Sequence, residues 1–539
     1  MAPPPVTPSE FDVVVCGGSL AGAATALLLL RARPGLRVAI VEKSERFPRR
    51  VGEATVEISA YFLGRVLGLT QHLNECHLAK QGMRFWFANE SARTLANCSE
   101  LGSRYLTRLP SWQVDRSVLD EEVLRRAVAA GATLIRPAKA VRVELAAAGS
   151  QKVTVESAAG RTELTGRWVV DGSGFTALLA RQEQWFRRNE AHPTTAVWAR
   201  WRGVKDWDGA ELAGKFPAWF AACHTMRATA TNHLVGDGWW SWWIPLRGGD
   251  YSVGVVFDQR RVTWPRKDSV ATSLKEFLTE RHPVARELLA DASPVAGDVQ
   301  WRANLPYRST VFAGDGFALV GDAAAFLDPF YSPGMDWLSY SVTMATTLIL
   351  AERGGEGGSA LAARIADHNR ILTRSYERWF EAIYRDKYDV MGDFELMRTA
   401  FRLDLSLYYL GIVSQPLKRG PEALGEPVFA TPPSELPFRL MRLYNRRLAR
   451  MGRERRARGV FGRKNAGERL LIDGYLPDNS TARATLGALL GWLKLELTEG
   501  WRSWFSAEPA RPLPDDRAGS AGTVPGPAPT ARPECALRS

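Results

Sequence analysis

The first forty-two residues contain the pattern that most constrains the fold of this chain. Residues 11–16 form a short apolar run, residues 23–30 have the continuous apolar character of a buried helix, and residues 37–42 form a second apolar run that ends in an acid. Strand, helix and strand in this order make a βαβ unit, whose crossover helix packs on a parallel sheet. The sequence therefore predicts an α/β fold with a Rossmann-like domain at its N-terminal end.

A glycine-rich turn, Gly17-Gly-Ser-Leu-Ala-Gly22, joins the first strand to the helix. Backbone N–H groups at the start of such a helix hold the pyrophosphate of a dinucleotide, and an acid about 20 residues further on binds the ribose. Glu42 stands at that distance, whereas Ser19 replaces the usual middle glycine and places a Cβ near the phosphate. The alternative is a glycine turn that binds no nucleotide. The nucleotide-binding candidates here are Gly17, Gly18, Ser19, Ala21, Gly22, Glu42 and Lys43.

Further along, alternating segments at 141–145, 152–156 and 162–170 predict an antiparallel meander, and the aromatic-rich stretch 196–257 reads as strands with helical insertions. A chain of 539 residues exceeds the roughly 250–300 residues of a single core, so we expect several modules. These are a nucleotide-binding module at 1–185 with a return segment at 301–345, a substrate-binding sheet module at 186–300, a helical region at 346–506 and a disordered tail at 507–539.

Composition and charge exclude several classes of protein. The five cysteines lack CxxC spacing and the seven histidines lack HxxxH spacing, so we expect neither a disulfide framework nor a metal site. No apolar run reaches 18 residues and the N-terminus lacks a signal-peptide pattern, which predicts a cytoplasmic protein without a membrane span. The net charge of +12 is concentrated between Arg439 and Lys464, so we expect no nucleic-acid partner.

The glycine turn, an Asp-Gly pair at 171–172 and a Gly-Asp pair at 321–322 together resemble the motifs of the FAD-dependent monooxygenase superfamily. The resemblance implies that FAD is the cofactor and that Asp322 binds its ribityl chain. It also implies that a helix starting near Gly334 directs its positive end toward the flavin. Arg116 matches a position near the flavin, and its alternative is a surface arginine at the start of a helix.

Three shorter segments are similar to those of flavin-dependent halogenases. Gly52-Glu-Ala-Thr55 resembles their GEAT segment, Trp240-Ser-Trp-Trp-Ile-Pro245 fits WxWxIP, and Phe326-Leu-Asp-Pro-Phe-Tyr-Ser-Pro-Gly334 fits FxxPxxSxG. The resemblance covers roughly residues 12–350. It implies flavin contacts by Glu53, Ala54, Thr55, Arg116, Asp322, Pro329, Ser332, Gly334 and Met335. It implies a halide passage lined by Trp240, Trp242, Ile244, Pro245, Phe326, Ser332, Pro333 and Gly334.

The candidate catalytic residue is Lys80, in a segment that resembles the KxGxxF lysine segment of the halogenases. Hypohalous acid reacts indiscriminately unless an ammonium holds it by a hydrogen bond or an amine captures it as a haloamine. Lysine serves either role because burial readily shifts its protonation. Without this context Lys80 would be a solvated surface charge.

The resemblance also implies the reaction and its partners. Reduced FAD, O2 and chloride or bromide yield hypohalous acid, which reaches Lys80 and halogenates an electron-rich aromatic substrate, free or tethered to a carrier protein. A separate flavin reductase supplies reduced FAD, since no second dinucleotide motif occurs. The alternatives are an FAD-dependent aromatic hydroxylase or other flavin oxidoreductase, and a non-catalytic flavin-binding protein.

One departure concerns the glutamate that tryptophan halogenases pair with their lysine. The corresponding region offers only Asp328, which fits a turn, and Asp336, which fits a helix N-cap better than a base. This favours a phenol, pyrrole or other activated ring over free tryptophan as the substrate.

Two C-terminal segments have helical periodicity. The segment 439–464 has eleven Lys or Arg and one acid, and Leu443 and Leu448 fall on its apolar side. It predicts a helix with a solvated basic face, or a docking surface for an acidic carrier protein. The segment 486–505 is amphipathic and fits a docked terminal helix better than a membrane anchor.

Overall fold

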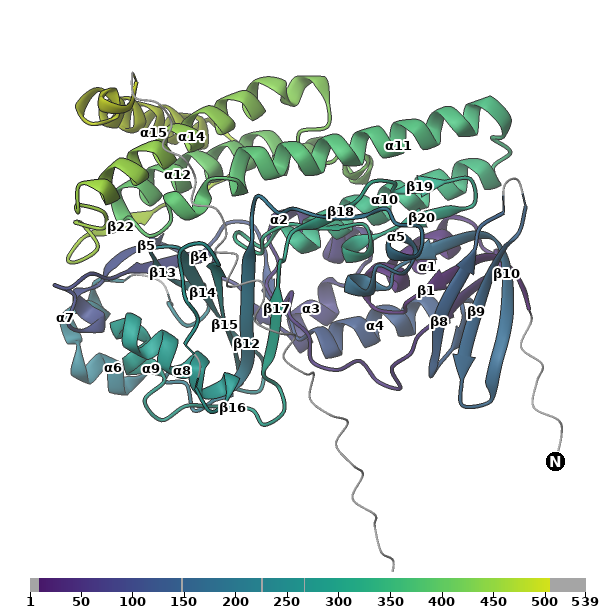
Figure 1. Cartoon of the computed structure of the whole chain (residues 1–539), viewed down its shortest axis with the longest axis horizontal. Helices are drawn as coiled ribbons and strands as arrows, with labels where there is room; N and C mark the ends of the chain where they lie inside the picture. The colour runs from purple at the N-terminus through teal and green to yellow at the C-terminus, as the bar shows by residue number, and fades with distance from the viewer. Residues whose placement is uncertain (1–8, 147–148, 224–225, 266, 505–539) are drawn as a thin grey trace, which may run out of the picture.

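The structure is a computed structural model that describes residues 9–146, 149–223, 226–265 and 267–504. Two sheets stand side by side, and a layer of long helices lies across both of them (Figure 1). Within the described ranges one sheet has 8 strands and is built around the N-terminal βαβ unit, and the other has 9 strands and is mainly antiparallel. The predicted fold class is confirmed, with a Rossmann-like domain, an antiparallel-sheet module and a C-terminal helical region. The tail at 507–539 lies outside the described residues.

The first sheet carries the parallel strands that bring the sequence motifs to one edge. In spatial order they are β7 (Thr133–Ile135), β2 (Val38–Val41), β1 (Glu10–Cys16), β10 (Gly160–Asp171) and β20 (Phe317–Leu319). The predicted meander is confirmed, because β8 (Ala138–Glu144) and β9 (Gln151–Ser157) run antiparallel into β10. Since parallel strands share the direction of their carboxyl ends, the loops that follow β1, β10 and β20 meet at the same edge.

The second sheet extends beyond the expected 186–300 segment. Two of its strands come from residues 83–103 and one comes from residues 469–472. Segments that are distant in sequence therefore complete this sheet. Its strands in order are β16 (Ser293–Pro294), β12 (Thr194–Arg202), β15 (Tyr251–Asp258), β14 (Trp239–Pro245), β13 (Thr231–Gly236), β4 (Met83–Phe87), β5 (Ser99–Ser103) and β22 (Arg469–Ile472), and β17 (Gln300–Ala303) also pairs with β12.

The tryptophans of β14 divide between two cores because successive side chains of a strand point to opposite faces. Trp240 and Trp242 belong to the core shared with the parallel-sheet domain. Trp239 and Trp243 belong to a separate core under the sheet, where Phe277 of helix α8 (Val270–Arg281) also packs. The WxWxIP segment is therefore a fully buried strand with two different aromatic faces.

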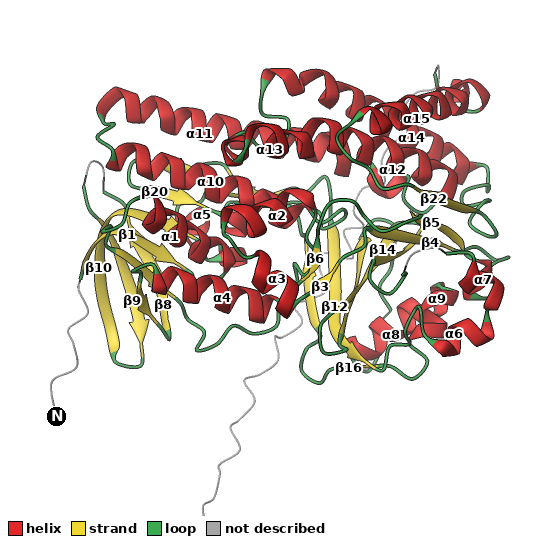
Figure 2. Ribbon diagram, turned by 180° about the vertical axis from the view of Figure 1, so that it is seen from behind, coloured by secondary structure: helices red, strands yellow, loops and turns green. Residues whose placement is uncertain are grey.

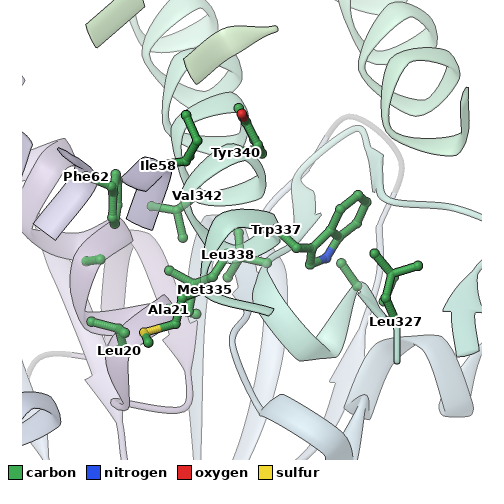
Figure 3. Packing of buried hydrophobic residues seen from close by; sticks show 14 of the residues in the cluster. Leu20, Ala21, Ile58, Phe62, Leu327, Met335, Trp337, Leu338, Tyr340 and Val342 are labelled. Atoms are coloured by element: carbon green, nitrogen blue, oxygen red, sulfur yellow. The ribbon is translucent and has the colours of Figure 1, made fainter. Parts of the chain in front are cut away.

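Helix α10 (Pro333–Arg353), which begins in the return segment 301–345, packs against the N-terminal βαβ unit. Leu20 and Ala21 of helix α1 (Leu20–Ala32) pack against Met335 and Leu338 of α10 (Figure 3). All four side chains are buried. This packing places the N-terminal ends of the two helices next to each other at the edge where the parallel strands end.

The C-terminal helices form the layer that covers both sheets (Figure 2). The main helices are α11 (Gly358–Trp379), α12 (Phe394–Leu407), α14 (Glu435–Ala457) and α15 (Asn479–Thr498). In the part of the chain that the structure describes, no helix is long and apolar enough to cross a membrane.

The basic segment 439–464 is not the solvated face that its sequence predicts. Helix α14 does bury one face, but Leu443 is 51% exposed and lies outside it. Most of its cations pair with acids from other parts of the chain, because α14 packs between several acidic elements. These ion pairs include those of Arg446 with Glu381, Arg447 with Glu496, Arg453 with Asp389, Arg455 with Asp393, Glu395 and Glu499, Arg456 with Asp237, and Lys464 with Glu395.

Arg455 is the buried centre of this ion-pair cluster. Its guanidinium nitrogens lie 2.8 Å from Asp393 Oδ1, 2.7 Å from Glu395 Oε2 and 2.7 Å from Glu499 Oε2, and its side chain is fully buried. Removal of one partner from such a cluster leaves uncompensated buried charge.

We expect Arg455→Met to lower the free energy of unfolding by about 3–5 kcal/mol, because three carboxylates lose their shared cation. The matched control is Arg439→Met on the same helix, where the arginine side chain is 73% exposed. Urea unfolding of the two variants measures the difference. Equal stability of the two variants would contradict the role of the cluster.

Candidate active site

A cavity of 170 Å³ lies where the parallel strands end and faces the second sheet. It gathers most of the residues that the sequence nominates, from segments more than 300 residues apart. The nominated residues that line it are Ser19, Ala21, Glu53, Ala54, Arg116, Trp240, Trp242, Ile244, Asp322, Phe326, Pro329, Ser332, Pro333, Gly334 and Met335. The nominated residues outside this lining are Gly17, Gly18, Gly22, Glu42, Lys43, Thr55, Lys80 and Pro245.

The glycines of the first turn shape the edge of this cavity. A Cβ on Gly22 would lie 1.9 Å from the carbonyl oxygen of Gly17, and a Cβ on Gly17 would lie 2.5 Å from the carbonyl oxygen of Gly172. The turn therefore packs directly on the Asp-Gly motif. The buried Glu42 fixes the turn, since its Oε2 accepts a hydrogen bond of 2.9 Å from the Gly18 N–H.

Two nominated residues have a different environment from the rest of this set. Lys43 is exposed to solvent beyond β2. Ser19 is the N-cap of α1 but makes no side-chain capping hydrogen bond, and its side chain borders the cavity. Ser19, which replaces the middle glycine of the motif, thus places a hydroxyl at the cavity. This hydroxyl is next to the N–H groups of the first turn of α1, which have no partner within the helix.

Asp322 and Arg116 place opposite charges on the cavity wall. Burial raises the pKa of Asp322 to about 6, and the charge of Arg116 acts in the opposite direction. Arg116 is the first residue of helix α4 (Arg116–Ala129), and Asp120 holds its guanidinium with nitrogen–oxygen distances of 2.8 and 3.1 Å. The interpretation of Arg116 as a surface arginine is wrong, because its side chain is 12% exposed and lines the cavity.

Helix α10 begins at the cavity with two residues in the left-handed region, Tyr331 at φ 68° and Ser332 at φ 57°. Ser332 is its N-cap, and the Ser332 N–H donates to the carbonyl oxygen of Pro329 at 2.9 Å. That N–H is therefore not available for an anion. The N–H groups of Gly334 and Met335, in the first turn of the helix, have no partner within the helix and lie at the cavity.

These features fit FAD. The cavity meets the N-terminal ends of two helices, which favour phosphate and the negative edge of a reduced flavin. A Cβ on Gly334 would meet no protein atom within 4 Å, so the space beside it is open to a ring system. Arg302 adds a cation to the wall, with its guanidinium 3.7 Å from the centre of the Phe175 ring.

A second cavity of 110 Å³ lies between the second sheet, the segment at Val56 and Glu57, and the helical layer, and it contains Lys80. The side chain of Lys80 is buried, and its Nζ donates a hydrogen bond of 2.7 Å to the carbonyl oxygen of Thr55. Burial lowers the pKa of Lys80 to about 8, and the charges of Glu57 and Asp336 partly oppose that shift. Lys80 is therefore no surface charge.

Asp336 lines the same cavity as Lys80. The prediction that it caps the helix is wrong, because Ser332 takes the N-cap position and Asp336 lies inside the first turn. Its carboxylate accepts hydrogen bonds from the Ser59 N–H at 2.9 Å and from the Tyr408 hydroxyl at 3.1 Å. Burial raises the pKa of Asp336 to about 7, so the group changes protonation near neutral pH.

A thin partition separates the two cavities. Glu53 and Ala54 line the first cavity, Val56 and Glu57 line the second, and Pro333 borders both. Thr55 lies between these pairs and is buried, and its carbonyl oxygen holds Lys80. The short GEAT-like segment is thus the wall between the nucleotide-type cavity and the lysine.

Asp328 lines the first cavity and does not line the cavity that contains Lys80. Its carboxylate accepts hydrogen bonds from the Tyr388 hydroxyl at 2.8 Å and the Phe330 N–H at 3.0 Å, and His192 Nε2 lies 3.0 Å away. Tyr388 also accepts a hydrogen bond of 3.0 Å from Trp240 Nε1. Asp328 is therefore a buried anchor that fixes one of the two cavity tryptophans through Tyr388.

Several residues at the two cavities carry no local sequence signal. His233 stacks on Phe85 at 4.8 Å and lines the first cavity, and burial lowers its pKa to about 3. Tyr408 and Asp404 reach the second cavity from the C-terminal helices. Only the fold brings these residues to the site.

Comparisons with known proteins agree with this geometry. The family model described as FAD dependent oxidoreductase matches residues 12–240. A flavin-dependent halogenase of Dictyostelium discoideum is 26% identical over 374 residues, which are 63% of this chain and 60% of that protein's length. The tryptophan 2-halogenase of Chondromyces crocatus is 28% identical over 386 residues, which are 69% of this chain and 67% of that protein. The crystal structure of halogenase PltM has a TM-score of 0.70 at 19% identity and covers 92% of this chain and 98% of that one.

The cavity at the strand ends and the match of residues 12–240 to that family model together indicate an enzyme of the flavin oxidoreductase type. The relatives and the solved structure to which the chain is similar are halogenases.

We expect Gly334→Ala to weaken FAD binding by about tenfold, since the new methyl group enters the cavity where the protein leaves open space. Gly214→Ala is the matched control, because a Cβ on Gly214 also meets no protein atom within 4 Å and Gly214 lies in helix α6 (Ala210–Lys215), outside the cavity lining. Flavin fluorescence titration measures both affinities. Unchanged binding by Gly334→Ala would place FAD elsewhere.

Proposed function

We propose that this protein is a halogenase that uses reduced FAD, O2 and chloride or bromide to halogenate an electron-rich aromatic ring. The single observation that supports this most is the buried Lys80 in a cavity of its own, one short segment away from the nucleotide-type cavity. A hydroxylase transfers oxygen at the flavin itself and needs no such second compartment. The similarity to flavin-dependent halogenases and the sequence motifs support the same activity.

When bound, reduced FAD would supply the chemistry by which O2 oxidises halide to hypohalous acid. The residues that would hold it are the first turn of α1, Arg116, Asp322 and the first turn of α10. Gly334 and Met335 offer N–H groups for the halide at the same helix end. Trp240 and Trp242 lie on this side of the partition, where their rings fill volume and keep an aromatic substrate away from the flavin.

Lys80 directs the halogen transfer in this proposal. With a pKa of about 8 it is mainly an ammonium at pH 7, so it donates a hydrogen bond to the oxygen of hypohalous acid. The ring carbon attacks the halogen, the halogen–oxygen bond breaks, and the oxygen leaves as water with the Lys80 proton. The ring then loses its own proton, and Asp336 is the group in the cavity that can accept it.

The lining of the Lys80 cavity indicates the class of substrate. It contains Glu57, Asp336 and Asp404 together with several tyrosines, which disfavours an anionic substrate and suits a ring with hydrogen-bonding hydroxyl or N–H groups. A cavity of 110 Å³ suits a small ring system. The related halogenase PltM was solved in complex with phloroglucinol and FAD, which supports a phenol-type substrate here.

Two partners complete the proposal. A separate flavin reductase delivers reduced FAD, because the chain has one dinucleotide motif. The hypothesis of a carrier-protein partner loses its main support, because acidic residues of the chain itself pair with most of the cations in the basic segment 439–464. We therefore favour a free substrate over a tethered one.

We expect Lys80→Ala to abolish halogenation, with a loss of at least about a hundredfold in kcat, and to leave FAD binding unchanged. The exposed Lys139 on β8 provides the matched control, Lys139→Ala. The assay combines enzyme, FAD, a flavin reductase, NADH, bromide and phloroglucinol, with products identified by mass spectrometry. If the wild type forms only hydroxylated product, or if Lys80→Ala keeps full activity, the halogenase proposal fails.

The proposal also predicts a bell-shaped dependence of kcat/KM on pH. Below about pH 7 Asp336 gains a proton and cannot accept another, and above about pH 8 Lys80 loses the proton that it donates. Each limb should fall by about tenfold per pH unit. In Asp336→Asn the acid limb should disappear, and the alkaline limb should shift to lower pH because Lys80 loses a neighbouring negative charge. A wild-type acid limb that persists in Asp336→Asn would exclude this aspartate as the base.

A further inference from the structure

Helix α15 is docked on one face and bare on the other. Its buried face, which includes Ala488 and Trp492, packs against the helical layer and mainly against α12. On the opposite face Leu486 is 63% exposed, Leu490 67%, Leu493 47% and Leu497 69%. Four such leucines on one helix form a continuous apolar patch, which soluble proteins seldom leave uncovered.

Two half-exposed tryptophans follow the end of the helix. Trp501 and Trp504 are each 49% exposed. Helix α15 lies at the outer edge of the helical layer in both views of the molecule (Figures 1 and 2). We call the four leucines and two tryptophans the leucine stripe.

The spacing of the leucines determines what can cover them. Residues 486, 490, 493 and 497 are separated by four, three and four positions, which is the seam of a helix that pairs with another helix. The spacing is the same when it is read backwards. A second copy of the helix in antiparallel orientation therefore presents the same seam, as a two-fold interface requires.

We propose that the leucine stripe is the core of a two-fold interface between two copies of this chain, in which α15 packs antiparallel on α15 of the second copy. In this register Leu486 lies opposite Leu497 of the second copy, and Leu490 lies opposite Leu493 of the second copy. The two tryptophans at each end extend the contact beyond the helix pair.

The charges on the helix are compatible with this register. Lys494 is exposed beside the stripe, and it lies opposite position 489 of the second copy rather than opposite its own equivalent. The exposed Arg483 lies opposite position 500 of the second copy, next to the exposed Trp501, where a guanidinium can stack on the indole. Glu496 of this helix and its C-cap residue Glu499 already pair with Arg447 and Arg455 within the chain.

Other occupants fit the stripe less well. The segment 505–539 is rich in proline, alanine and glycine and has few large apolar residues with which to cover six. A membrane-surface helix has many Lys or Arg along its polar face, whereas the face of α15 opposite the stripe is packed against protein. A second copy requires no further component.

The test is the mass of the full-length protein in solution across a concentration series, by analytical ultracentrifugation. We expect the wild type to sediment as a dimer of twice 59.7 kDa and the variant Leu490→Gln/Leu493→Gln as a monomer. Leu436→Gln is the matched control, since Leu436 is 75% exposed on α14 and is outside the stripe. Unchanged flavin binding and thermal unfolding of the variant show that its fold is intact. A monomeric wild type, or a variant that stays dimeric, overturns the proposal.

Cysteine cross-linking tests the antiparallel register. A mixture of the Leu486→Cys and Leu497→Cys proteins should form a disulfide-linked dimer, whereas each protein alone should give only the background of the wild-type cysteines. Efficient cross-linking of Leu486→Cys with itself would indicate parallel pairing and overturn the register. Co-sedimentation of a monomeric wild type with anionic phosphatidylglycerol vesicles, lost in Leu490→Gln/Leu493→Gln, would assign the stripe to a lipid surface and overturn the dimer.

Discussion

The contact between the first turns of helices α1 and α10 is the constraint on which the rest of the site depends. Leu20 and Ala21 of one helix pack on Met335 and Leu338 of the other, although more than 300 residues separate them in the sequence. This contact sets two helix N-terminal ends side by side at the end of the parallel strands. It creates the positive potential that suits a dinucleotide and a reduced flavin, and it fixes where Pro333 and Asp336 stand relative to the second cavity.

The burial of charge explains why the two cavities differ in chemistry. In the first cavity Arg116 and Arg302 face Asp322, which suits a cofactor that carries phosphates. In the second, one lysine shares a low-dielectric space with Glu57 and Asp336, and burial moves the pKa values of Lys80 and Asp336 toward each other. An acid and a base that both titrate near neutral pH are the requirement for proton transfer at physiological pH.

The sequence predicts the parts of this site that depend on local patterns. Periodicity and turn chemistry identify the glycine turn with its strand and helix. The WxWxIP strand and the Lys80 segment are each a short continuous motif, and the resemblance to halogenase motifs identifies them. The prediction that Asp336 caps a helix is wrong because it depends on where α10 begins. The N-cap is Ser332, in the left-handed region, so α10 begins three residues before Asp336. The basic segment was misread because the acids that neutralise it, such as Asp237 and Glu395, come from distant elements that only tertiary packing brings together.

The partition formed by residues 53–57 contributes residues to both cavities, so one short segment connects the first cavity to Lys80. Thr55 offers its carbonyl oxygen to Lys80, while its neighbours Glu53 and Ala54 form the wall of the other cavity. The carbonyl that holds the amine is therefore within two residues of the wall of the other cavity. The opposite wall of the lysine cavity is built from the C-terminal helices and residues 472–475, which do not line the first cavity. The walls of the lysine cavity that come from the helical layer can therefore be substituted without a change in any residue that lines the first cavity.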